Sequence, residues 1–142
     1  MGRGSRADAS DALDVILIDT SAWIEFLRDT GSPVCERVDA LMDSEIAVCD
    51  PVRMEILAGA RSEAHLADLR GLLARATLLP TSTVHYEQAA GLYRSARSEG
   101  LTVRTLIDCL IAAIAIDHAV PLLQADRDFA ALASISPLVL DN

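Results

Sequence analysis

Short, fully apolar runs of β-forming residues alternate with helix-length segments, and this alternation constrains the fold more than any other feature of the chain. Two such runs, at residues 15–18 and 46–49, are typical of strands buried on both faces. The pattern predicts further strands at 77–79, 120–123 and 138–140, and helices at 20–28, 33–42, 51–59, 63–76, 83–98, 105–118 and, briefly, after 126. It therefore predicts an α/β three-layer sandwich, in which a mainly parallel sheet of four or five strands has helices on both faces.

The chain has room for one domain with an aliphatic core. Its 142 residues are 51% hydrophobic but only 4% aromatic. Residues 1–14 lack periodicity and are predicted to be a disordered extension before a single domain at 15–142. No apolar run reaches the roughly 18 residues of a membrane span, and the N-terminus lacks a signal-peptide core, so a cytoplasmic location is expected. The cysteines at 35, 49 and 109 form no C-x-x-C pair and are interpreted as reduced core residues.

The net charge of −9 argues against a general nucleic-acid binder, because phosphate binding favours a basic face. Two features weaken that objection. A site that collects carboxylates for a metal ion is negative before the metal binds. All 12 basic residues are arginine, whose planar guanidinium can bind phosphate through two hydrogen bonds.

Two acids are predicted at one edge of the sheet. Asp19 follows the first strand and Asp126 follows a late strand, and ligands of parallel sheets bind beyond the carboxyl ends of the strands. Each has a structural alternative. Asp19, with Thr20 or Ser21, could cap the next helix, and Asp126 with Asp128 could form a cap with a first-turn acid.

Two further acids lie on predicted apolar helices. Glu55 shares a helix face with Val52 and Ile56, where a lone carboxylate is costly to bury. An ion pair with Arg53 or Arg61 is the alternative, although neither stands three or four positions away. Asp108 interrupts a helix that is apolar all round, and its alternative role is a capping box with the threonine three positions earlier.

Convergence of these four acids would require a cation. Mg²⁺ suits an all-oxygen site, and Mn²⁺ is expected to substitute for it. The histidines at 65, 85 and 118 lack the spacing of zinc ligands.

Several segments together resemble a PIN domain of the VapC toxin type. They lie, in order, at residues 15–23, 54–59, 93–97, 102–104, 108–112 and 126–129, and the resemblance spans about 15–140. It implies a divalent-metal endoribonuclease that is the toxin of a toxin–antitoxin pair, with a cognate VapB-type antitoxin, a tendency to form homodimers, and transfer RNA as substrate. By motif match, Asp19 and Asp108 are the main metal ligands, Glu55 and Asp126 complete the catalytic set, and Asp128 is a secondary acid.

The expected reaction is RNA cleavage by a metal-activated water, which Glu55 or Asp126 orients or deprotonates and Thr20 or Ser21 helps to position. The candidates for contacting the RNA backbone, which could equally be solvated charges, are Arg28, Arg94, Arg97 and Arg104. Trp23 is predicted to serve core or dimer packing rather than base stacking.

Two other functions fit parts of the pattern. A phosphatase could use Asp19 as nucleophile, but Ser21 replaces the usual companion acid two residues on. A non-catalytic, metal-binding or receiver-like interaction domain is the second alternative, although a receiver requires a lysine that this chain lacks. A basic antitoxin tail could place an arginine among the four carboxylates.

Overall fold

The computed structural model describes residues 15–141, so the predicted extension at 1–14 lies outside the described residues. Five parallel strands form one sheet in the order β3-β2-β1-β4-β5. The strands are β1 (Ile16–Ile18), β2 (Ile46–Cys49), β3 (Thr77–Leu79), β4 (Leu122–Leu123) and β5 (Leu140–Asp141).

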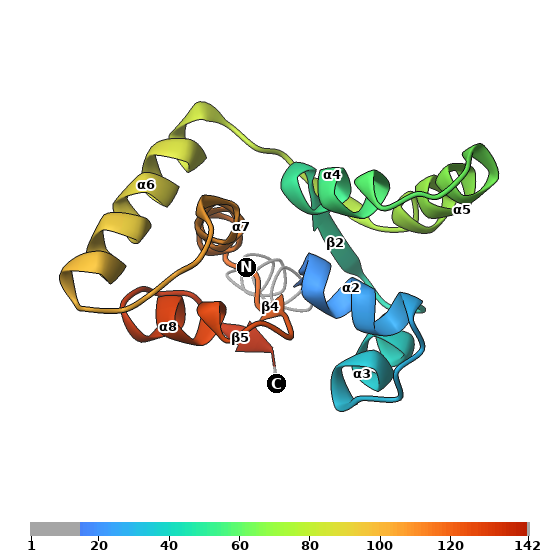
Figure 1. Cartoon of the computed structure of the whole chain (residues 1–142), viewed down its shortest axis with the longest axis horizontal. Coiled ribbons are helices and arrows are strands. Elements are labelled where there is room, and N and C mark those ends of the chain that lie inside the picture. Colours follow the sequence, from blue (N-terminus) through green and yellow to red (C-terminus); the bar gives the residue numbers. More distant parts are fainter. Residues whose placement is uncertain (1–14, 142) are drawn as a thin grey trace, which may run out of the picture.

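Helices cover both faces of this sheet, which confirms the predicted three-layer α/β fold (Figure 1). One layer contains α2 (Thr20–Leu27), α3 (Pro33–Leu41), α4 (Asp50–Ala58) and α5 (Glu63–Leu73). The other contains α6 (Thr83–Ser98), α7 (Leu106–Asp117) and α8 (Asp128–Ser134). Right-handed crossovers explain this division. The chain moves across the sheet in one direction from β1 to β2 and β3, and in the opposite direction from β3 to β4 and β5.

The boundary between the two directions of winding lies between β1 and β4, where a parallel sheet opens a crevice for ligands. The register pairs Ile18 with Leu123, the last residues of the two strands. The Asp19 backbone N–H continues the pairing by donating to the Leu123 carbonyl at 2.9 Å. The chain segments that follow β1 and β4 therefore start side by side.

The core is aliphatic, with two large aromatic side chains. Leu17 and Ile18 of β1 are fully buried, and every residue of α7 from 109 to 115 is buried. Trp23 and Phe129 are also fully buried, which confirms that Trp23 is a packing residue. The three cysteines are buried and free, as predicted.

Some predicted boundaries differ from the observed ones. Helix α5 ends at Leu73, three residues early, because the chain turns at 74–76 before entering β3. Strand β4 starts at Leu122 rather than Val120, since Pro121 has no N–H to donate to a neighbouring strand. No helix among residues 15–141 combines the length and the hydropathy that crossing a membrane requires.

Candidate active site

Asp19 lies at the exit of β1 and is buried, with 3% of its surface exposed. Its carboxylate caps α2, since Oδ2 accepts hydrogen bonds from the backbone N–H and the hydroxyl of Ser21. The Ser21 hydroxyl oxygen in turn accepts from the Ala125 backbone N–H at 2.9 Å, which links the segments after β1 and β4. The other oxygen, Asp19 Oδ1, is buried without a hydrogen-bond partner in the described residues. Capping therefore uses only half of this carboxylate.

Glu55 projects from α4 and is oriented by the first residue of α2. The Thr20 hydroxyl donates to Glu55 Oε1 at 2.6 Å. Neither Arg53 nor Arg61 forms an ion pair with Glu55 among the described residues, so the alternative of a local salt bridge is wrong. Buried Val52 and Ile56 anchor the neighbouring face of the helix. The acid is thus held toward the crevice by a contact 35 positions away in the sequence.

Asp108 combines a helix-start role with a position in the acidic cluster. Thr105 caps α7 by accepting the Asp108 backbone N–H at 3.2 Å, while the Asp108 carboxylate lies near Asp126 and Asp128. One carboxylate oxygen from each of these three acids lies within 4.8 Å of the others. The capping interpretation and the functional one are therefore compatible, because the cap uses the backbone of Asp108.

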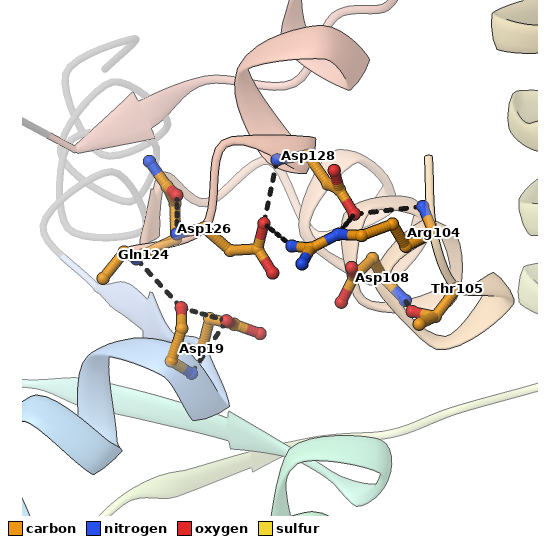
Figure 2. Close-up of polar contacts among 9 residues, drawn as sticks. Asp19, Arg104, Thr105, Asp108, Gln124, Asp126 and Asp128 are labelled. Atoms are coloured by element: carbon orange, nitrogen blue, oxygen red, sulfur yellow. Dashed lines mark hydrogen bonds and ion pairs between the residues drawn. The ribbon is translucent and has the colours of Figure 1, made fainter. Parts of the chain in front are cut away.

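Asp126 and Asp128 flank the start of α8 and share one arginine. Arg104 Nη2 donates to Asp126 Oδ1 at 2.6 Å, and Arg104 Nε donates to Asp128 Oδ2 at 3.0 Å (Figure 2). The Arg104 backbone N–H adds a third bond, to Asp128 Oδ2. Gln124 accepts the Asp126 backbone N–H at 2.7 Å and fixes the turn. Arg104 therefore neutralises part of the acidic cluster, and its contact with RNA stays a prediction.

The electrostatics of the crevice follow from this crowding. Burial, followed by the charges of Asp19 and Asp126, raises the pKa of Asp108 to about 7. Burial also raises the pKa of Asp19, against the hydrogen bonds from Ser21, and the charge of Glu55 adds to the increase. For Asp128, burial raises the pKa, but the hydrogen bonds and charge of Arg104 outweigh it, so its pKa lies below the usual range. The crowding of these carboxyl groups therefore favours either protonation of Asp19 and Asp108 or the binding of a cation.

Arg104→Gln should destabilise the domain, because it removes the counter-charge of the buried Asp128. The loss of stability should be larger at neutral pH than in acid. A depressed carboxyl pKa contributes stability above the unfolded pKa of about 4, and this contribution is lost as the pH falls. The difference in Tm between wild type and variant should therefore narrow between pH 7.5 and about 3.5. Thermal unfolding across this range checks it, and a difference that widens in acid would contradict it.

The residues present fit a divalent cation. All five acids offer oxygen ligands, as Mg²⁺ and Mn²⁺ prefer, and the partnerless Asp19 Oδ1 is a buried acceptor that requires a donor or a cation. Figure 2 shows the carboxylates of Asp19, Asp108 and Asp126 turned toward a common space.

The remaining predicted residues lie partly within the site and partly outside it. Thr20 and Ser21 hydrogen-bond to acids of the site, and their role toward water stays a prediction. Arg28 lines a cavity that also includes Glu55. Arg94 and Arg97 line another hollow, on α6, that includes none of the five acids.

A second cluster of potential metal ligands was not predicted from the sequence, because its members are close only after α6 packs against α7. Ligand atoms of His85, Asp117 and His118 lie within 4.8 Å of one another. His85 Nδ1 accepts the Ser82 backbone N–H at 2.9 Å, so the neutral ring carries its proton on Nε2, which bonds Asp117 at 2.8 Å. This arrangement occupies both ring nitrogens of His85 and ties the two helices together.

Comparison with known proteins identifies the fold and the family. The PIN domain family matches residues 16–135. Two mycobacterial proteins, VapC ribonuclease Mb1587 of Mycobacterium bovis and ribonuclease VapC11 of Mycobacterium tuberculosis, are each 43% identical over 128 residues, covering 87% of this chain and 96% of the relative.

Solved structures share the fold at low sequence identity. VapBC2 from Rickettsia felis, bound to a promoter DNA fragment, matches with a TM-score of 0.73 at 20% identity, covering 90% of this chain and 98% of that one. VapBC-1 from nontypeable Haemophilus influenzae matches with 0.72 at 17% identity, covering 90% and 97%. The family match and the two mycobacterial relatives show that the chain belongs to the PIN domain family and, within it, to the VapC ribonucleases.

Proposed function

We propose that this chain is an Mg²⁺-dependent endoribonuclease, the toxin of a pair with a VapB-type antitoxin. The observation that carries the proposal is the group of acids at the ends of β1 and β4. Asp108, Asp126 and Asp128 cluster there, Asp19 has a partnerless buried oxygen beside them, and Glu55 is bonded to the residue after Asp19. The ribonuclease names of the 43%-identical relatives support the reaction, and the VapBC complexes among the similar structures support the partner.

Asp19 and Asp108 are the residues we propose to hold the ion, with Asp126 beside them. When bound, the metal supplies Lewis-acid activation of water and positive charge at the scissile phosphate. Ser21 fixes one oxygen of Asp19 and leaves the other available. Thr20 orients Glu55, so that Glu55 or Asp126 can orient the attacking water and accept its proton. In-line attack would leave 5′-phosphate and 3′-hydroxyl ends.

The substrate and assembly are proposals of the same kind. Transfer RNA is the proposed target, and a homodimer in the cytoplasm is the proposed form. One similar structure, VapC20 of Mycobacterium tuberculosis, is described as a sarcin–ricin loop cleaving toxin, so ribosomal RNA is the natural comparison substrate. Sequencing the ends of RNA cut in cells would distinguish the two classes.

Removal of divalent metal should abolish cleavage. Purified protein incubated with total RNA should produce fragments with Mg²⁺ or Mn²⁺ and none with EDTA, because the acidic crevice repels phosphate when it lacks a cation. Excess Mn²⁺ should restore cleavage.

The Asp19→Asn protein, purified in the same way, controls for contaminating ribonuclease. Cleavage that Asp19→Asn retains identifies a contaminating ribonuclease, whereas cleavage in EDTA that wild type shows and Asp19→Asn lacks would contradict the metal requirement. Intact RNA at every metal concentration would favour the non-catalytic, interaction-domain alternative.

A further inference from the structure

The cavity beside Glu55 has the size of a small-ligand site and two arginines in its lining. It measures about 380 Å³ and lies between α2, the end of α4 and α5. This volume falls within the roughly 300–1,000 Å³ of pockets that bind small ligands. Glu55 is part of its wall and accepts a hydrogen bond from Thr20, the residue after Asp19, so the cavity adjoins the acidic site.

Cationic and donor groups line this cavity. Arg28 and Arg61 are exposed, and neither guanidinium forms an ion pair within residues 15–141. His65 Nδ1 accepts the Arg61 backbone N–H at 3.0 Å, so the neutral ring carries its proton on Nε2, where it can donate to a ligand. Ile24 and Leu27 supply an apolar wall suited to a ribose or a base.

These groups are placed where a phosphodiester substrate needs them. A crevice of carboxylates repels the phosphates that flank the cleavage point, so a neighbouring surface must supply positive charge. Arg104 cannot do so while it is paired with Asp126 and Asp128. The hollow at Arg94 and Arg97 includes no acid of the site.

We propose that this cavity, the Arg28–Arg61 pocket, binds the RNA strand one or two nucleotides from the scissile phosphate, with Arg28 and Arg61 on phosphate oxygens. The inference rests on the proposed ribonuclease function. The two unpaired guanidinium groups favour RNA over a basic antitoxin tail, because they would repel a segment of the same charge.

The test compares single variants that each remove one positive charge. Arg28→Gln and Arg61→Gln alter the pocket, whereas Arg70→Gln alters an exposed arginine of α5 that does not line it. The probe is a fluorescein-labelled, random-sequence 16-nucleotide RNA, used in cleavage assays with Mn²⁺ and in anisotropy binding to the Asp108→Asn protein.

Each pocket variant should raise KM and Kd roughly tenfold, as expected for a lost charge-assisted contact, with kcat within about twofold of wild type. The salt dependence of binding should flatten by about 0.7 per arginine removed. Photo-crosslinking with 4-thiouridine should label the end of α2 and the segment between α4 and α5. Arg70→Gln should match wild type.

The pocket assignment would be overturned if wild type cleaves RNA but the pocket variants have the same KM and salt slope as Arg70→Gln. The Arg28–Arg61 pocket would then be left to a protein segment. A wild type that cleaves no RNA with any metal would instead overturn the ribonuclease function itself.

Discussion

Replacing Asp108 or Asp19 by asparagine should abolish RNA cleavage and leave the fold intact. The rate should fall by more than about a hundredfold, since loss of even an indirect partner of a metal ligand costs 10- to 100-fold. Asparagine retains the size of each side chain, and at Asp19 it retains an oxygen for the Ser21 hydrogen bonds that cap α2. Single-turnover cleavage of total RNA measures the loss, and circular dichroism checks the fold.

The same variants give a readout independent of activity. Mg²⁺ or Mn²⁺ should raise the Tm of wild type, because a ligand that binds the folded state stabilises it, and should do so far less for Asp108→Asn. Asp68→Asn, an exposed acid on α5, is the matched control and should respond like wild type. Normal cleavage or an unchanged metal response in Asp108→Asn would refute the ligand assignment.

The pH dependence of stability should also differ between wild type and Asp108→Asn. The pKa of Asp108 is raised to about 7, mainly by burial, so ionisation disfavours the folded state. The contribution of its protonated form is complete below the unfolded pKa of about 4 and is lost as the pH rises through about 7. In EDTA, the Tm of wild type should therefore fall relative to Asp108→Asn between pH 4 and 8.

Phe129→Ala should destabilise the domain by about 3–5 kcal/mol, because it leaves a large cavity in a core that excludes water. Phe129 is fully buried on α8, directly after Asp128. A loss of this size is a large share of the roughly 5–15 kcal/mol that keeps a typical domain folded.

Urea unfolding measures this loss, and Val139→Ala is the control. Val139 is 60% exposed, so its truncation should change stability by less than about 0.5 kcal/mol. A change below about 1 kcal/mol for Phe129→Ala would show that α8 does not depend on this contact. Cleavage should fall only in proportion to the unfolded fraction.

Local pattern was sufficient to predict the sheet and the position of two acids. The apolar runs at β1 and β2 are short and buried on both faces, as is typical of parallel strands that lie between two layers of helices. The order of strands and helices then placed Asp19 and Asp126 at one edge, as the register of Ile18 with Leu123 confirms.

Contacts between distant segments were beyond prediction from the residues. Arg104 gave no signal of its pairing, because Asp126 and Asp128 are more than 20 positions away and an exposed arginine suits many roles. The Thr20–Glu55 bond and the His85–Asp117 link have the same origin, since each depends on how two helices pack. The Arg28–Arg61 pocket likewise exists only after α2, α4 and α5 assemble.

The backbone bond from Asp19 to Leu123 has an evolutionary consequence. Main-chain atoms set the spacing between the two acid-bearing turns, so most side chains can drift without altering it. Chains only 17–20% identical can therefore retain the architecture, with TM-scores of 0.72–0.73. Side chains on the outer helices can therefore vary without moving the two acid-bearing turns, which makes this scaffold suitable for redesign by surface substitution.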